Sequence, residues 1–375
     1  MEEKLKKLQC SGCGSDIQSA HPQKVGYLEE KSLNKLLENN RPLLCRRCFR
    51  LLHYKEVTPL QIEAKDFEKV INKIPSKVSI VAVTDIFDLT VEFFSLLKQL
   101  PKSDEIIIVV NKIEDLPRDY KIAAVLDWIR KQAKKEQINL LYIVPVSAKT
   151  KYNIDLLYQI LSQEIKSDEV YFIGNANVGK SSLINALIKS QSRAFTEPAI
   201  SLLPGTTLNF LSFKNGHQNW YDTPGLLLKN QELPFLKLKD WESILPNSRL
   251  KPRTFQVFSG QTMFIGGLGW IEFLSGPKTS FIFYFNSQVT IHRRKTGSEV
   301  TNLEFYERQL GKILVPPREG NLSIGKFIFN KTTVKIREKT DFVIPAIGWV
   351  SINPGLELQI VTLEDLSGSL RIAIV

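Results

Sequence analysis

A glycine-rich stretch near the middle of the chain places the strongest constraint on its fold. Residues 174–181 read GNANVGKS, the pattern G-x-x-x-x-G-K-S. The apolar run EVYFI precedes it, and SLINALIKS follows with apolar residues at helical spacing. A strand, a tight loop and a helix in this order form a cradle for phosphate, because the loop N–H groups and the helix N-terminus both face the anion. The alternative is a glycine-rich turn without a ligand.

This loop predicts defined contacts with a nucleotide. Lys180 is expected to reach the β- and γ-phosphates, and Ser181 is expected to ligate Mg²⁺. The predicted nucleotide-binding residues of the loop and the first helical turn are Gly174, Asn175, Asn177, Val178, Gly179, Lys180, Ser181 and Ser182.

The size and composition of the chain are those of a soluble multidomain protein. Its 375 residues suffice for two or three domains, and 43% of them are hydrophobic and 24% charged. No apolar run approaches the ~20 residues of a membrane span. The N-terminal residues contain no signal-peptide core, and two early glutamates argue against a transit peptide. We therefore expect a cytoplasmic protein with no membrane contact.

The net charge of +11 is unevenly distributed. Residues 1–60 hold 11 basic and 7 acidic residues, and residues 231–375 hold 18 and 13. Residues 61–230, with 21 and 19, are close to neutral. Basic flanks around a neutral centre favour contact with a polyanion, and a solvated basic surface without a partner is the alternative.

All four cysteines occur in two C-x-x-C pairs, Cys10 with Cys13 and Cys45 with Cys48. Four thiolates at this spacing are typical of structural zinc, which stabilises segments too short for a good core. Disulfides and a redox pair are the alternatives, and a cytosolic setting argues against disulfides. We predict a closed Cys₄ zinc site.

The second cysteine pair lies in CRRCFRLLHYK, where basic residues alternate with aromatic ones. This interleaving suits an RNA-facing surface, and a solvated rim is the alternative. The residues concerned are Arg46, Arg47, Arg50 and Lys55, beside Phe49 and Tyr54.

Strand-like and helix-like segments alternate from about residue 61, which predicts a mostly parallel sheet with helices on both faces. The expected strands lie within 77–87, 104–112 and 138–149, and the expected helices within 90–100, 120–137 and 153–165. The second helix should present Ala123, Leu126 and Ile129 on one face. The ligand is expected at the carboxyl ends of the strands.

Four short polar motifs lie at or near those strand ends: NKIE (111–114), SAK (147–149), PGTT (204–207) and DTPG (222–225). DTPG is expected to end a strand that forms a hairpin with LNFLSF. Together the motifs resemble the guanine-nucleotide motifs of P-loop GTPases.

This resemblance implies roles for individual residues. Asn111 would bond the purine ring, Lys112 would pack over it, and Glu114 would accept from the guanine N1–H and amine. The SAK residues Ser147, Ala148 and Lys149 would form the loop whose Ala148 N–H meets the guanine O6.

The same resemblance implies the γ-phosphate contacts. Thr207, with Thr206 as the alternative, would close on Mg²⁺ and the γ-phosphate. Asp222 would hold a Mg²⁺ water, and the Gly225 N–H would sense the γ-phosphate. The implied catalytic residues are Lys180, Thr207, Asn177 and Gly225.

The motifs stand in permuted order, because the base-recognition motifs precede the phosphate loop. We therefore predict a circularly permuted P-loop GTPase domain, with QEIKSDEVYF as the join between the old ends. It spans 61–230, between a zinc-finger domain (1–60) and a β-rich RNA- or protein-binding domain (231–375). The last domain would follow directly on the switch segment at DTPG and move with the nucleotide state.

Over nearly its full length the chain resembles the YqeH family of circularly permuted GTPases. The resemblance rests on the cysteine pairs, DIFD (85–88), NKIEDLPRD, SAK, GNANVGKSSLIN, LPGTTL, YDTPG and PRTFQVFSGQTMFIGGLGWIEFLSG. It implies GTP and GDP as ligands, Mg²⁺ and Zn²⁺ as metals, and the small ribosomal subunit with its rRNA as partner. DNA is not an expected partner.

Two positions depart from common GTPase patterns. Glu114 stands where Asp is usual, and poorer geometry there would weaken the discrimination of GTP from ATP. Leu226 stands where Ras-like enzymes place a water-positioning Gln, which is normal for the resembled family. Asn177 matches a position that helps to bind K⁺ in related GTPases, and a bound cation would replace an arginine finger. The alternative is that Asn177 only shapes the loop.

The C-terminal third is rich in alternating β-branched and aromatic runs, which predicts a mostly β domain with one helix near NLEFYERQLGKIL. Two segments around Trp270 and Trp349 share an apolar–Gly–Trp–apolar pattern, either a decayed repeat or a coincidence. IHRRK (291–295) is the expected phosphate-contacting stretch.

The favoured function is a GTP-hydrolysing switch in small-subunit assembly, and the alternative is a nucleotide-regulated RNA-binding scaffold with negligible turnover.

Overall fold

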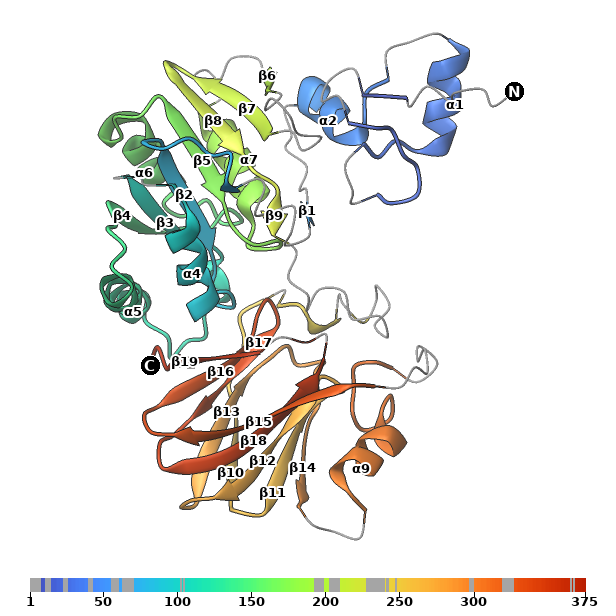
Figure 1. Ribbon diagram of the computed structural model, residues 1–375, viewed down its shortest axis with the longest axis vertical. Helices are drawn as coiled ribbons and strands as arrows, with labels where there is room; N and C mark the ends of the chain where they lie inside the picture. The colour runs from blue at the N-terminus through green and yellow to red at the C-terminus, as the bar shows by residue number, and fades with distance from the viewer. Residues whose placement is uncertain are drawn as a thin grey trace. The chain divides into compact units, whose positions relative to one another are not determined.

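The computed structural model describes most of the chain (Figure 1). The described residues are 8–10, 15–22, 26–39, 43–54, 61–62, 71–101, 103, 105–191, 199–201, 210–226, 240, 243–246, 248–296, 300–318, 327–364, 366 and 368–375. The chain divides into two compact units. Unit 1 comprises Met1–Asp85, Ser95–Ile113 and Gln132–Leu227, and unit 2 comprises Ile86–Phe94, Glu114–Lys131 and Leu228–Val375.

Unit 1 is built around a seven-stranded sheet with the order β4-β3-β2-β5-β8-β7-β6. Its parallel strands are β2 (Ser79–Thr84), β3 (Ile106–Val110), β4 (Tyr142–Pro145), β5 (Glu169–Ile173) and β8 (Gln218–Asp222). The antiparallel edge consists of β7 (Phe210–Asn215) and β6 (Ala199–Ser201), so the predicted β7–β8 hairpin is confirmed. The strands SIVAVT and IIIVV are buried along their whole length, as expected of β-branched runs covered on both faces.

Helices connect these strands as the alternation predicted (Figure 1). They are α4 (Val91–Gln99), η1 (Ile113–Asp115), α5 (Ile122–Lys135), α6 (Ile154–Gln159), the π-turn η2 (Ile160–Glu164) and α7 (Lys180–Ser190). The predicted buried face of α5 was partly wrong, since Val125, Trp128 and Ile129 are buried while Ala123 is exposed. Trp128 lies next to Ile129 and has the largest apolar surface of α5 to bury. Its burial therefore sets which side of α5 faces the core.

The permuted order of this domain is confirmed, because the chain completes β2, β3 and β4 before it enters the phosphate-loop strand β5. The join between η2 and β5 is short and is held by one carboxylate. The Oε1 of Glu105 accepts from the Lys166 N–H at 2.9 Å, and its Oε2 accepts from the Ser167 N–H at 3.3 Å. These bonds satisfy backbone donors that the join would otherwise leave without a strand partner.

The N-terminal part of unit 1 contains two helices, α1 (Glu30–Glu38) and α2 (Arg46–Tyr54). α2 begins directly after Cys45, and the Arg46 N–H donates to the Tyr27 carbonyl at 2.7 Å. The short strand β1 (Gln61–Ile62) pairs in parallel with β9 (Gly225–Leu226), which begins on the last residue of the DTPG motif.

Unit 2 contains two five-stranded antiparallel sheets, with the orders β10-β13-β17-β16-β19 and β14-β11-β12-β18-β15. The strands are β10 (Arg253–Val257), β11 (Gln261–Ile265), β12 (Gly269–Ser275), β13 (Thr279–Tyr284), β14 (Ile291–Lys295), β15 (Phe329–Ile336), β16 (Thr340–Ile344), β17 (Gly348–Ile352), β18 (Leu356–Leu363) and β19 (Ser369–Ile372). The one predicted helix is present as α9 (Asn302–Gln309), which begins with a capping box between Thr301 and Glu304. The mostly β character of this region is confirmed.

The two tryptophan segments form equivalent hairpins. In β11–β12, Ile265 pairs with Gly269 and Phe264 pairs with Trp270, and in β16–β17 Ile344 pairs with Gly348. Val343 likewise pairs with Trp349, so both tryptophans hold the same register. Their side chains are 3% and 0% exposed, which makes both of them core residues.

Unit 2 also includes segment 86–94, which follows Asp85 directly, and segment 114–131, which begins with the last residue of NKIE. The fully buried guanidinium of Arg371 on β19 donates to the carbonyls of Ile86 and Leu89 at 2.9 and 2.8 Å, and pairs with Asp341 at 3.1 Å. The Trp128 indole donates to the Ile372 carbonyl at 2.9 Å. The β-rich region is therefore packed on segments 86–94 and 114–131, whereas the predicted switch connection (227–239) lies outside the described residues.

Within the described ranges, none of the helices combines the length and the apolar character needed to cross a membrane.

Candidate nucleotide and metal sites

The phosphate loop connects β5 to α7, as the motif predicted. Gly179 caps α7 with a φ of 85°, and a Cβ there would lie 2.3 Å from the Asn111 Nδ2. Only glycine fits this position, because the backbone is left-handed and a side chain of the base motif passes against it. Asn177 also has a positive φ, 68°, which asparagine tolerates better than most residues, so it does shape the loop.

Asn111 joins the base motif to the phosphate loop. Its Nδ2 donates to the Val178 carbonyl at 2.9 Å, and its Oδ1 accepts from the Ala148 N–H at 3.1 Å. The side chain is buried, so these bonds form away from water. Three motifs separated in the sequence therefore meet at one residue: NKIE, SAK and the glycine-rich loop.

Lys112 is held by an acidic residue that the sequence left without a role. Its Nζ lies 2.7 Å from the Oδ2 of Asp85, whose side chain is buried. Asp85 follows the end of β2 directly and begins the DIFD segment. A carboxylate immediately after a buried parallel strand was the available signal, since polar residues at strand ends face the ligand edge of such sheets.

We expect Asp85→Asn to weaken GTP and GDP binding about tenfold and by equal factors, because both ligands share the base that Lys112 would cover. A charge-assisted hydrogen bond of about 1.5 kcal/mol corresponds to that factor. Fluorescent-nucleotide titration measures it. Asp127→Asn is the matched control, since Asp127 forms an exposed ion pair with Arg130 on α5. Unchanged affinity in Asp85→Asn would contradict the role of this pair.

Glu114 lies in η1 and belongs to unit 2. Its backbone carbonyl accepts from the Arg249 Nε at 3.4 Å. Its Oε2 is buried without a hydrogen-bond partner among the described residues, so this carboxylate has an unused acceptor. A guanine that donates N–H groups would satisfy it, which agrees with the role that the motif implies.

Lys180 and Asp222 form a buried ion pair between the phosphate loop and DTPG. The Lys180 Nζ donates to the Asp222 Oδ1 and to the Thr223 carbonyl, and the two side chains are 6% and 1% exposed. Burial lowers the pKa of Lys180, and the charge of Asp222 opposes that shift. The phosphates of a bound nucleotide would replace Asp222 as the partner of the Lys180 ammonium, as the motif implies.

The other predicted residues occupy the same loop and its surroundings. Ser181 is buried at the start of α7, and Gly225 lies so close to the loop that a Cβ would be 3.2 Å from the Ala176 Cα. Ser147 is buried and its Oγ accepts from the Thr150 N–H at 2.9 Å. Asn175 is half-buried, Gly174 and Val178 are buried, and Lys149, Asn177 and Ser182 are exposed. Thr207 lies outside the described residues.

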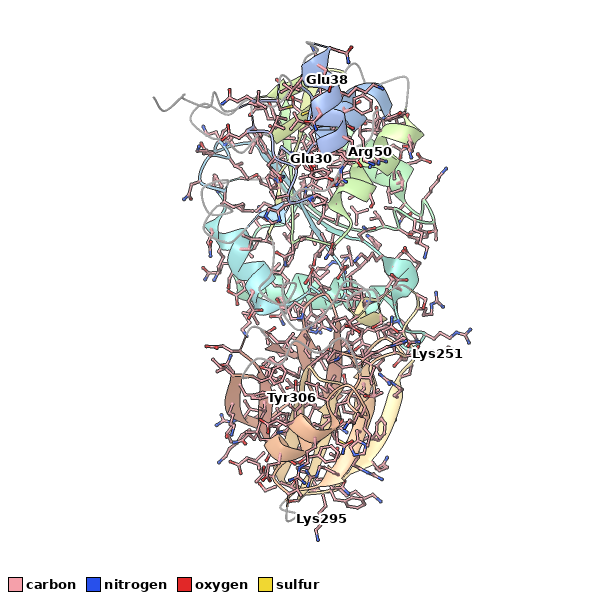
Figure 2. The ribbon with its side chains drawn as sticks, turned by 90° about the vertical axis from the view of Figure 1, so that its right-hand side faces the viewer. Glu30, Glu38, Arg50, Lys251, Lys295 and Tyr306 are labelled. Atoms are coloured by element: carbon pink, nitrogen blue, oxygen red, sulfur yellow. The ribbon has the colours of Figure 1, made fainter. Side chains whose placement is uncertain are left out.

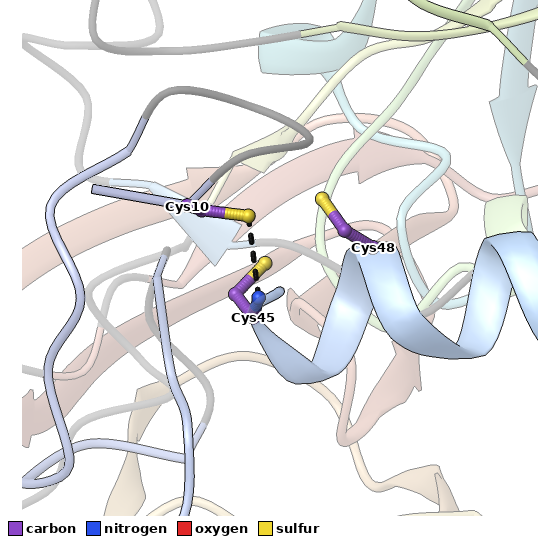
Figure 3. A group of neighbouring side chains, drawn as sticks. All are labelled: Cys10, Cys45 and Cys48. Atoms are coloured by element: carbon purple, nitrogen blue, oxygen red, sulfur yellow. Dashed lines mark hydrogen bonds between the residues drawn. The ribbon is translucent and has the colours of Figure 1, made fainter. Parts of the chain in front are cut away.

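Three cysteines converge in the N-terminal part of unit 1 (Figure 3). The Sγ atoms of Cys10, Cys45 and Cys48 lie within 4.8 Å of one another, and all three side chains are buried. The Cys45 N–H donates to the Cys10 Sγ at 3.2 Å, a contact that favours a thiolate. Zinc–sulfur bonds of about 2.3 Å fit such a cluster. Cys13, the predicted fourth ligand, lies outside the described residues.

We expect Cys48→Ser to lose stoichiometric zinc, since a hydroxyl replaces one of the thiolates. The N-terminal segment should then lose its fold, because metal binding supplies its folding free energy. Elemental analysis and hydrogen exchange of residues 8–54 measure both effects. Lys31→Ser, an exposed change on α1, should keep one zinc per chain. A Cys48→Ser protein with a full equivalent of zinc would exclude this ligand set.

Comparisons with known proteins agree with this geometry. Residues 169–248 match the family described as 50S ribosome-binding GTPase, and residues 278–374 match the one described as YqeH-like, C-terminal. The uncharacterized protein YqeH of Bacillus subtilis (strain 168) is 32% identical over 93% of this chain and 94% of its own length. A putative nitric oxide synthase of Oryza sativa subsp. japonica is 29% identical over 92% of this chain and 70% of its own. NO-associated protein 1, chloroplastic/mitochondrial, of Arabidopsis thaliana is 28% identical over 92% and 69%.

Proposed function

Since the chain belongs to the YqeH family of GTPases, we propose that it binds and hydrolyses GTP as a switch in assembly of the small ribosomal subunit. The observation that supports the nucleotide chemistry is the position of Asn111. It bonds the phosphate loop through the Val178 carbonyl and the SAK loop through the Ala148 N–H. A nucleotide whose phosphates bind the phosphate loop would therefore have its base next to the SAK loop.

The base is recognised by polar groups from two motifs. Asn111 and the Ala148 N–H offer hydrogen bonds to the purine edge, and the unpartnered Glu114 Oε2 accepts from guanine N–H groups. An adenine would leave this carboxylate buried and unpaired, at a cost of about 1–3 kcal/mol or more. Guanine is therefore the preferred base.

The phosphates are held on the other side of Asn111. With nucleotide bound, Lys180 would pair with the β- and γ-phosphates instead of Asp222, and Asp222 would be one of the residues that hold Mg²⁺ through a water. Ser181 and Thr207 would hold Mg²⁺, which when bound neutralises charge on the phosphate oxygens. Gly225 lies against the loop backbone at Ala176, where its N–H can report the presence of the γ-phosphate.

Three observations support a ribosomal partner. The flanks of the chain carry most of its +11 charge. The matched GTPase family is described as 50S ribosome-binding, which supports contact with a ribosome although it names the large subunit. On β14, Arg293 and Lys295 are exposed, and Figure 2 shows Lys295 projecting from its end of unit 2. His292 and Arg294 instead pack on Phe305 as ring and cation–π contacts, so only part of IHRRK is available to phosphates.

Co-sedimentation with purified ribosomal subunits tests the partner. The protein is spun with small or large subunits in the presence of a non-hydrolysable GTP analogue, GDP or no nucleotide. Analogue-dependent binding to the small subunit is the expected result. Binding to the large subunit alone would redirect the proposal to the partner named in the family description, and binding independent of nucleotide would remove the switch.

The second candidate is an RNA-binding scaffold with negligible turnover, and Leu226 after DTPG favours it. We propose instead that a cation assists hydrolysis, with K⁺ near Asn177 as one source of charge. Hydrolysis of GTP by the isolated protein that rises when K⁺ replaces Na⁺ would exclude the scaffold. A rate indistinguishable from that of buffer, with small subunits present, would favour it.

A further inference from the structure

The zinc-binding segment contributes a cation to the phosphate site. The Nη2 of Arg47, between Cys45 and Cys48 on α2, lies 3.5 Å from the Asp222 Oδ2. Its side chain is only 10% exposed, so the predicted solvated or RNA-facing position was wrong for this residue. The neighbouring Arg46 has different contacts: it donates to the Pro22 carbonyl at 2.6 Å and stacks over Tyr27.

The side chains of Asp222, Lys180 and Arg47 thus form a nearly buried charged cluster. Asp222 holds Lys180 on one carboxylate oxygen and Arg47 on the other, and the exposed fractions are 1%, 6% and 10%. Two of the three are donors of the kind that bind phosphate oxygens, and both lie against the Asp222 carboxylate. An anion that draws Lys180 away from Asp222 would therefore arrive beside Arg47 as well.

The anion that fits is the terminal phosphate of a nucleotide. Lys180 belongs to the phosphate loop, and its departure to the phosphates would leave Arg47 and Asp222 beside the γ-phosphate. An arginine presents a planar set of five N–H donors that match phosphate oxygens, and it keeps its charge when buried.

We propose that Arg47 is a catalytic residue of this GTPase, an arginine finger that the zinc-binding segment supplies within the chain. The inference rests on the proposed GTP hydrolysis. In the reaction the water oxygen forms a bond to the γ-phosphorus while the bond to the bridging oxygen breaks, and its electron pair stays on GDP. The proton of the water leaves with the phosphate. Arg47 transfers no proton and stabilises charge on the γ-phosphoryl and bridging oxygens.

This assignment gives the metal site a role beyond local stability. Cys45 and Cys48 flank Arg47, and the Cys48 side chain is fully buried. A metal that holds both thiolates would fix the helical turn from which the guanidinium reaches Asp222. Preorganised charge is effective because it needs no rearrangement when the reaction occurs.

The test compares Arg47→Ala, Arg47→Lys and Arg46→Ala with the full-length wild-type protein and Lys180→Ala. Single-turnover hydrolysis of GTP measures the rate. Binding of GDP with and without aluminium fluoride measures affinity for a mimic of the transferring phosphoryl group. Zinc content confirms that each variant keeps its N-terminal fold.

Arg47→Ala should hydrolyse GTP about 10³-fold more slowly, the lower end of arginine-finger effects, with GDP affinity within threefold of wild type. Aluminium fluoride should no longer tighten its GDP binding. Arg47→Lys should hydrolyse GTP nearly as slowly as Arg47→Ala, because a lysine ammonium lacks the planar set of N–H donors. Arg46→Ala should have the wild-type rate.

A wild-type rate in Arg47→Ala, or unchanged tightening by aluminium fluoride, would overturn the inference and leave the GTPase proposal standing. Tighter nucleotide binding at an unchanged rate would also overturn it, since Arg47 would then only hold the nucleotide-free site closed. If wild type is no faster than Lys180→Ala, the proposed hydrolysis itself fails and this role fails with it.

Discussion

Lys180→Ala is expected to lower the rate of GTP hydrolysis by at least 10²- to 10³-fold, the effect of removing a preorganised donor from a developing anion. The structure gives this residue no substitute on the loop. Its Nζ is buried against Asp222 and the Thr223 carbonyl, and Lys180 is the first residue of α7. Single-turnover hydrolysis and fluorescent-GTP titration measure the loss.

Lys189→Ala provides the control for Lys180→Ala, because Lys189 is exposed near the other end of α7. Its rate and affinity should stay within twofold of wild type. A Lys180→Ala protein that keeps a tenth of the wild-type rate would show that the glycine-rich loop does not hold the reacting phosphates.

Arg371→Leu is expected to lower the free energy of unfolding by about 3–5 kcal/mol, because it leaves Asp341 charged, fully buried and without its cation. It also removes the donor for the carbonyls of Ile86 and Leu89. Chemical denaturation, followed by the fluorescence of the buried tryptophans, measures the change.

The exposed Arg337, at the end of β15, provides the control, and Arg337→Leu should shift stability by less than about 0.5 kcal/mol. The double variant Arg371→Leu with Asp341→Leu should recover part of the loss, since it removes the unpaired charge. An Arg371→Leu protein as stable as the Arg337 control would show that this network does not hold unit 2 together.

The Arg371 network is one of several contacts between the β-rich strands and segments 86–94 and 114–131 of unit 2. Ile86 follows Asp85, and Asp85 pairs with Lys112 of the base motif. Within unit 2, the Tyr284 hydroxyl donates to Asp119 at 2.5 Å, and the Trp349 indole donates to the Tyr120 hydroxyl at 2.9 Å. Within unit 2, these contacts fix segments 86–94 and 114–131 against the β-sheets.

Much of the fold followed from local patterns. The runs SIVAVT and IIIVV predicted buried parallel strands, and the glycine-rich loop predicted the strand–loop–helix of β5 and α7. The alternating runs after residue 254 predicted a mostly β region with one helix, and the structure has two β-sheets and α9 there. These features depend on residues within one or two turns of each other, where backbone propensity and side-chain periodicity act.

The buried face of α5 shows where such patterns stop. Periodicity predicted a face through Ala123, but Trp128 turned the helix toward the Arg371 guanidinium, 5.8 Å from its ring. That contact joins positions more than two hundred residues apart, and local sequence carries no record of it.

By itself the sequence determined the chemistry that the chain can offer: a phosphate loop, guanine-type motifs in permuted order, and paired cysteines. Only the tertiary structure decided which charges meet. It brought Asp85 to Lys112, and it brought Arg47 and Lys180 to one carboxylate of Asp222. The physical reason is range: strands and caps arise from neighbours along the chain, whereas a buried ion pair forms only after folding has removed water from residues that are distant in sequence.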